Sequence, residues 1–204
     1  MSIENETHDL VVTRTFDAPQ ERVWRAWSDA DQVMRWWGPQ GFTSPTCRMD
    51  FREGGTTLVC MRSGEGWELY NTWRYRSIDP MDRIEFVQGF ADKDGTGVAP
   101  AELGLPPGIP EEVRHVVSLS PIDDTRTELT VREYGYSSAE VAEISRAGME
   151  QCLGKMATSV AGAVTAGVVL GGVGGLFGKD WERHQVAKYL GEQSDRETGT
   201  DARS

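Results

Sequence analysis

The sequence predicts an α+β domain in which a curved antiparallel sheet of six to seven strands wraps around one long C-terminal helix. Short turns separate the candidate strands, and consecutive strands with short turns pair antiparallel. Only the stretch near residues 138–158 is long enough to cover the apolar face that such strands share. Five stretches alternate apolar and polar side chains, as half-buried strands do: 46–51, 67–78, 84–90, 113–119 and 129–133. Residues 56–62 predict a return strand after the turn at Gly54 and Gly55.

Length and charge limit the possible functions. A chain of 204 residues and 22.6 kDa suits one globular domain with an appended tail. The net charge of −11 repels phosphate backbones, so we expect no nucleic-acid partner. The N-terminus has no apolar run of signal-peptide length, and we expect a cytoplasmic protein. Cys47, Cys60 and Cys152 form no CxxC pair, so no disulfide framework, metal site or cofactor is predicted.

The first elements are a strand and two short helices. Residues 9–16 are rich in β-branched side chains and predict a strand. Pro19 suits the first turn of a helix that carries apolar residues at helical spacing, namely Val23, Trp24 and Trp27. Asp29 or Asp31 can cap a second short helix, which ends at Gly38.

Two further features flank the last strands. Residues 91–111 contain four prolines and four glycines, which predicts a long loop at the sheet edge and allows a lid. Ser137 followed by Glu140 fits a capping box at the start of the long helix.

The chain divides into a patterned domain, residues 1–158, and a tail, residues 159–204. Residues 159–178 carry no charge and seven glycines, with Gly167, Gly171 and Gly175 four apart. This stretch permits a weak transmembrane helix, but its glycines lower helix propensity and apolar area, so a soluble extension is favoured over membrane contact. The rest of the tail predicts one short amphipathic helix and a polar end.

Four spaced motifs resemble a known family: R14-T-F-D-A-P19, V23-W24-x-A26-W27, R35-W-W-G-P39 and D50-F-R-E-G-G55. They are similar to bacterial proteins related to the C-terminal domain of the activator of heat shock protein 90 ATPase, in the START-like (SRPBCC) superfamily. The resemblance covers roughly residues 9–158. It implies the helix-grip fold and a hydrophobic cavity between sheet and helix. It implies no single activity, because the superfamily includes lipid carriers, polyketide cyclases and co-chaperones.

The candidate ligand-binding residues are those expected on the inward faces of the strands, on the covering helix and at the WWGP corner. For each of them, packing in the core is the alternative and is favoured, except that the alternative for Glu133 is a place at the solvent end of its strand. The residues are Trp36, Trp37, Trp67, Trp73, Tyr75, Phe86, His115, Glu133, Gly148 and Cys152.

His115 and Glu133 are the polar residues among these inward positions, and they are the catalytic candidates. If they face each other, the pair can perform acid–base chemistry of a polyketide cyclase or dehydratase type. The sequence has no nucleophile motif beside them, so binding of a small hydrophobic molecule, by a carrier, sensor or sequestering protein, is favoured over catalysis. A chaperone-interacting module is the third hypothesis, although the chain begins almost at its first strand and shows no additional N-terminal domain for that contact.

Overall fold

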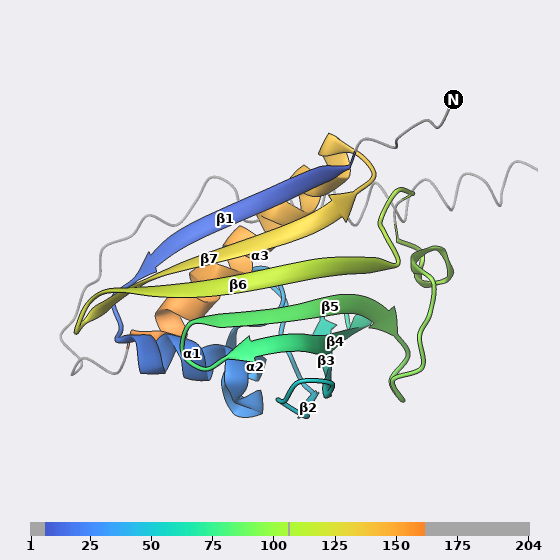
Figure 1. Cartoon of the computed structure of the whole chain (residues 1–204). Helices are drawn as coiled ribbons and strands as arrows, with labels where there is room; N and C mark the ends of the chain where they lie inside the picture. The colour runs from blue at the N-terminus through green and yellow to red at the C-terminus, as the bar shows by residue number, and fades with distance from the viewer. Residues whose placement is uncertain (1–6, 106, 162–204) are drawn as a thin grey trace, which may run out of the picture. The chain divides into compact units, whose positions relative to one another are not determined.

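Seven antiparallel strands form one curved sheet in the computed structural model, which describes residues 7–105 and 107–161. Their order in space is β1-β7-β6-β5-β4-β3-β2, so the first strand pairs with the last (Figure 1). The predicted fold class and strand number are confirmed. The strands are β1 (His8–Phe16), β2 (Cys47–Met49), β3 (Thr56–Arg62), β4 (Glu68–Asp79), β5 (Arg83–Ala91), β6 (Glu112–Asp123) and β7 (Arg126–Tyr136).

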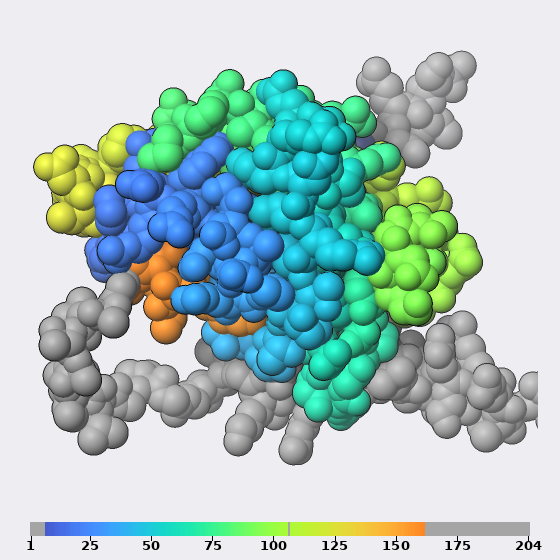
Figure 2. All heavy atoms as spheres, turned by 90° about the horizontal axis from the view of Figure 1, so that it is seen from below, coloured from blue at the N-terminus to red at the C-terminus, as the bar shows by residue number. Residues whose placement is uncertain are grey.

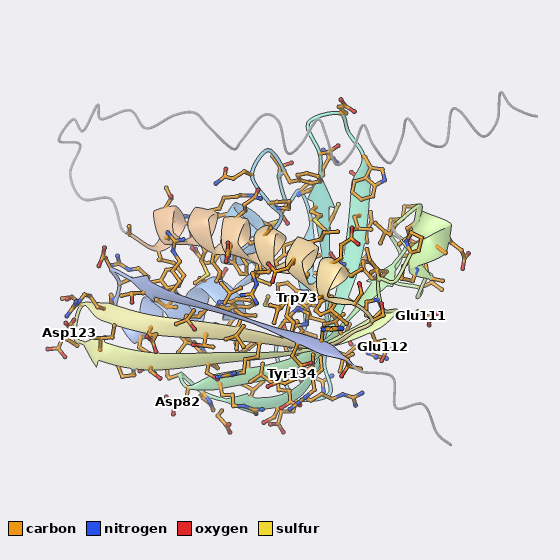
Figure 3. The ribbon with its side chains drawn as sticks, turned by 90° about the horizontal axis from the view of Figure 1, so that it is seen from above. Trp73, Asp82, Glu111, Glu112, Asp123 and Tyr134 are labelled. Carbon is orange, nitrogen blue, oxygen red and sulfur yellow. The ribbon has the colours of Figure 1, made fainter. Side chains whose placement is uncertain are left out.

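One long helix, α3 (Ala139–Val160), covers one face of this sheet, which we call the inner face (Figures 1 and 3). It packs against β1 and β7 through an apolar stripe with helical spacing. The buried residues of that stripe include Met149, Leu153, Met156 and Val160. None of the described helices has both the length and the hydropathy needed to cross a bilayer. The sequence predictions for residues 162–204 lie outside the described residues.

Two short helices, α1 (Gln20–Ser28) and α2 (Ala30–Trp36), follow β1 as predicted. Pro19 is the N-cap of α1, and Asp29 caps α2 by accepting hydrogen bonds from the backbone N–H groups of Asp31 and Gln32. The indole N–H of Trp36 donates to the carbonyl of Ala26 at 2.8 Å, which joins the two helices. Burial of Trp36 and Trp27 stabilises helices that are too short to form alone.

Two sequence predictions are wrong in detail. The cap of α3 is Ser138 rather than Ser137, because the Ser138 hydroxyl accepts from the backbone N–H of Val141, while the Ser137 hydroxyl donates to the carbonyl of Gly108. Trp67 is not buried with the other inward residues, because it precedes β4 at the hairpin tip, where it is 44% exposed and its ring meets that of Phe42 edge to face.

The segment between β5 and β6 is the predicted loop, and its described part holds one 3-10 turn, η1 (Pro100–Leu103), at one end of the sheet (Figure 1). Near its start it passes over the outer face, where a Cβ on Gly95 would lie 3.8 Å from Leu58. Near its end, the carbonyl of Gly108 accepts a hydrogen bond from Ser137, and Ile109 packs against the hydrophobic core. The loop therefore reaches from the outer face to the start of α3; its role as a lid stays a prediction.

Candidate functional site

A single row of inner-face residues crosses five strands at the centre of the site. Tyr75 on β4 lies opposite Phe86 on β5, Phe86 opposite His115 on β6, His115 opposite Glu133 on β7, and Glu133 opposite Leu10 on β1. All five are at most 2% exposed. Side chains that are opposite on one face lie close enough to interact, so the register alone brings His115 and Glu133 together.

Glu133 is the centre of a buried polar network. Its Oε1 lies 3.4 Å from Nε2 of His115, within ion-pair range but longer than an ordinary hydrogen bond. Its Oε2 accepts hydrogen bonds from the hydroxyls of Tyr136 and Ser145, the latter at 2.9 Å. Oε1 has no hydrogen-bond partner among the described residues. One carboxylate oxygen is thus held by the protein and the other can accept a further hydrogen bond.

The tautomer of His115 follows from its second contact. Its Nδ1 lies 3.1 Å from the carbonyl oxygen of Val113, which can only accept a hydrogen bond, so Nδ1 carries a proton. The other nitrogen, Nε2, faces the Glu133 carboxyl group. The ring stacks on Phe86 with a centroid separation of 4.8 Å and an interplanar angle of 11°. These contacts leave Nε2 as the ring nitrogen that can take up or release a proton toward Glu133.

The carboxyl group of Glu133 is ionised despite its burial. Burial raises its pKa, but the nearby His115 imidazole and the hydrogen bonds from Tyr136 and Ser145 outweigh that effect and hold the pKa below its usual value. Burial beside this carboxylate also raises the pKa of the Tyr136 hydroxyl, which therefore stays protonated and donates. The Glu133 carboxylate is therefore the hydrogen-bond acceptor at the centre of the network.

Aromatic rings cover the next row of the inner face. Trp73 lies opposite Gln88, and its ring meets the ring of Trp37 edge to face at a centroid distance of 4.7 Å. Phe86 is 5.2 Å from Trp73 by ring centroids, which links this cluster to the row of His115. Figure 3 shows Trp73 between the sheet and α3. Trp37 is 4% exposed and Trp73 is fully buried, so both rings belong to the interior.

Lys155 of α3 holds the WWGP corner over this cluster. Its ammonium group donates to the carbonyls of Trp37, Gly38 and Phe42 at 3.4, 2.9 and 2.8 Å. Gly38 has φ +90°, and a Cβ there would lie only 3.1 Å from that of Phe42, so glycine is required at the corner. Partial burial lowers the pKa of Lys155. The three carbonyls take up its donors, so this cation is not free to bind a ligand.

Several buried polar atoms next to the cluster have no hydrogen-bond partner among the described residues. They are Nδ2 and Oδ1 of Asn71, Oε1 of Gln88, and the indole nitrogens of Trp37 and Trp73. Asn71 is 1% exposed and lies two residues before Trp73, on the same face of β4. Buried polar groups are normally hydrogen-bonded, so their concentration at this place calls for an explanation. We call Asn71, Trp73, Gln88, His115 and Glu133 the polar end of the inner face.

The structure brings most of the predicted residues together around this polar end. Cys152 is buried on the inward side of α3, and burial raises the pKa of its thiol to about 12. Tyr75 and Trp36 use their polar atoms within the protein, the first on Thr57 at 2.7 Å. A Cβ on Gly148 would meet no atom within 4 Å, so α3 borders open space there. Trp67 is 44% exposed and lies beside Phe42 at the edge of this group.

Four residues of the site were not predicted. Asn71 and Gln88 are polar residues at inward positions of strands, and the alternation that identified His115 could have found them too. Tyr136 could not be found by alternation, because it lies three residues after Glu133. Gly135, at φ +95°, and a register shift in the pairing of β1 with β7 allow it to turn inward. Ser145 belongs to α3, and only packing brings it to Glu133.

Metal binding has no support in the described part of the chain, where no three His, Cys, Asp or Glu side chains are grouped to hold an ion. All three cysteines are free. The available chemistry at the polar end is hydrogen bonding and proton transfer by a histidine and a carboxylate in an apolar surrounding.

Solved structures from several bacteria share this fold. A protein from Chromobacterium violaceum is 25% identical, with 74% of this chain and 96% of that one covered and a TM-score of 0.61. A protein from Arthrobacter aurescens is 28% identical over 74% of this chain and 85% of that one, with a TM-score of 0.60. The AHSA1 protein from Silicibacter pomeroyi is 22% identical over 76% and 98%, with a TM-score of 0.62, and supports the fold alone.

A comparison with curated proteins found no match. The family model described as Activator of Hsp90 ATPase homolog 1-like protein matches residues 17–161, which span nearly all of the sheet and α3. The chain therefore belongs to the family of Activator of Hsp90 ATPase homolog 1-like proteins, within the START-like (SRPBCC) superfamily.

Proposed function

We propose that this protein binds a small, uncharged, mainly apolar molecule that carries a carbonyl or hydroxyl oxygen, between the inner face of the sheet and α3. The observation that carries this proposal is Asn71, whose buried side chain has no hydrogen-bond partner for either polar atom among the described residues. An unpaired buried polar group costs ~1–3 kcal/mol. A ligand oxygen that bonds to this amide recovers that free energy and turns it into affinity.

The neighbouring groups favour the same ligand chemistry. The indole N–H groups of Trp37 and Trp73 can donate to a ligand oxygen, and Oε1 of Gln88 or Glu133 can accept from a ligand hydroxyl. A ligand anion is disfavoured because the Glu133 carboxylate is ionised and Lys155 is occupied by backbone carbonyls. The apolar part of the ligand would pack on the aromatic rings, next to the open space at Gly148.

A second candidate function, acid–base catalysis on the bound molecule, is favoured by one specific observation. His115 and Glu133 face each other across 3.4 Å, and because Nδ1 already carries a proton, Nε2 is the atom that can exchange a second proton with Glu133 or with a ligand atom. A cyclase or dehydratase reaction needs such a pair near an apolar substrate. Chaperone contact, a role in stress response and a cytoplasmic location stay predictions.

The binding proposal is tested with the full chain and Nile red, an uncharged apolar fluorophore with a carbonyl oxygen. We expect saturable binding with energy transfer from tryptophan. Asn71→Leu combined with Gln88→Leu should weaken it about tenfold, because two hydrogen bonds of roughly 0.5–1.5 kcal/mol each are lost. Native mass spectrometry of the purified protein, followed by solvent extraction, identifies a co-purifying molecule.

Thr72→Val is the matched control, because Thr72 is next to Asn71 on β4 but on the opposite face. This variant should bind Nile red like the wild type. Binding that does not saturate, or that the double variant leaves unchanged, contradicts the proposal. A chaperone retained in a pull-down together with no Nile red binding would favour the interaction module instead.

A further inference from the structure

A hollow of about 460 Å³ lies on the surface where α1, α2 and the end of α3 meet. Figure 2 views the face where the blue residues of α1 and α2 lie beside the orange end of α3. Three arginines line it, together with Pro19, Glu21, Gln32 and Ser159. Arg22 and Arg25 are three residues apart on α1, and Gln32 and Arg35 are three apart on α2, so each helix turns one polar pair to the hollow.

The arginines of this hollow differ from most others in their pairing. Seven arginines elsewhere in the described residues form ion pairs with carboxylates at 2.9 Å or less. Within the same described ranges, Arg22 and Arg35 have no carboxylate within 4.0 Å, and Arg25 reaches Asp29 only at 4.0 Å. Arg22 is held in place, because its guanidinium donates to the carbonyl of Val160 at 3.1 Å.

The local electrostatics oppose the overall charge of the protein. Three arginines and one acidic residue, Glu21, line the hollow, and Asp29 lies 4.0 Å from Arg25, although the whole chain has a net charge of −11. The start of α1 also lies here, and no side chain caps it, so its positive end adds to the field. A negative overall field repels polyanions and anionic surfaces but allows a small anion to reach such a pocket.

We infer that this arginine hollow, formed by Arg22, Arg25, Gln32 and Arg35, is a binding site for the phosphate group of a small phosphate ester. Guanidinium groups bind phosphate oxygens in pairs of charge-assisted hydrogen bonds, and Gln32 can donate a further one. The hollow has room for a phosphate and a small organic part. It is distinct from the polar end, because Ser159 is about 20 Å along α3 from Ser145 at the helical rise.

The test is a titration of the full chain, labelled with ¹⁵N, with inorganic phosphate and with glycerol 3-phosphate. We expect saturable amide shifts concentrated in residues 19–35 and a higher unfolding temperature. Arg25→Gln with Arg35→Gln should weaken phosphate binding by at least about tenfold, since one charge-assisted hydrogen bond is already worth that factor. Both arginines are exposed, so the double variant should fold like the wild type.

Arg132→Gln is the matched control, because it removes one charge from an exposed position on β7 away from the hollow. Equal weakening by this control, or the absence of saturable shifts in the wild type, overturns the inference. Sedimentation with phosphatidylcholine vesicles, with and without phosphatidylglycerol, tests whether the bound phosphate belongs to a lipid. Vesicle binding that requires both phosphatidylglycerol and Arg35 assigns the phosphate to a lipid headgroup. Asn71→Leu should leave phosphate binding unchanged. A failure of the phosphate proposal can therefore be told apart from a failure of the Nile red proposal.

Discussion

Replacement of Asn71 by leucine should make the protein more stable and a poorer binder. The side chain is 1% exposed, and neither of its polar atoms has a partner among the described residues. The cost of such a group is ~1–3 kcal/mol, and leucine has a similar size and no polar atoms, so the free energy of unfolding should rise by about that amount. For a domain of this size the melting temperature rises by roughly 2–4 °C for each kcal/mol.

The assay is urea unfolding monitored by tryptophan fluorescence. The slope of the free energy of unfolding against urea concentration checks that variant and wild type expose the same amount of surface on unfolding. Thr72→Val serves again as the neighbour on the opposite face and should change stability by less than about 0.5 kcal/mol. A loss of more than about 1 kcal/mol in Asn71→Leu would refute the reasoning, because it would mean that the amide makes net favourable bonds in the folded protein. A polar residue kept at a cost in stability points to function.

Three further predictions concern the rest of the site. The free energy of unfolding should fall as pH drops below about 5. The folded protein lowers the pKa of Glu133, so the ionised carboxylate stabilises the fold and this contribution is lost on protonation. Glu133→Gln should make the free energy of unfolding less dependent on pH in urea titrations between about pH 3 and 7. Lys155→Met should cost about 2–4 kcal/mol in urea unfolding, because three carbonyls of the WWGP corner lose their donor. Trp67→Ala should cost less than about 1 kcal/mol by thermal unfolding, whereas Trp73→Ala should cost about 3–5 kcal/mol, because only Trp73 is buried.

Each of these three predictions can be contradicted by one result. An unchanged acid slope in Glu133→Gln would mean that another group controls acid unfolding. A Lys155→Met variant as stable as the wild type would mean that burial of the ammonium offsets its hydrogen bonds. Equal costs at Trp67 and Trp73 would mean that the hairpin tip is packed in solution.

The core of the site was predictable because it depends on strand alternation. His115 and Glu133 were expected to share the inward face, and the pairing of β6 with β7 places them directly opposite each other. Asn71 and Gln88 obey the same rule, so the alternation along β4 and β5 also places their side chains on the inward face. Trp67 breaks the rule because β4 begins one residue later, and no local signal in the sequence marks that boundary.

The sequence by itself determined the order of the elements, an antiparallel sheet of six to seven strands and the inward position of the histidine and the carboxylate. These features depend on the spacing of apolar residues and on turn residues, which act over a few positions in the chain. Only the tertiary structure decided which polar atoms find partners. Lys155 donates to carbonyls of the WWGP corner that lie more than 110 residues away in the sequence. The side chain of Asn71 has no hydrogen-bond partner among the described residues, and the arginines of two helices line one hollow. Such contacts depend on how packed side chains fill space, which no local pattern encodes.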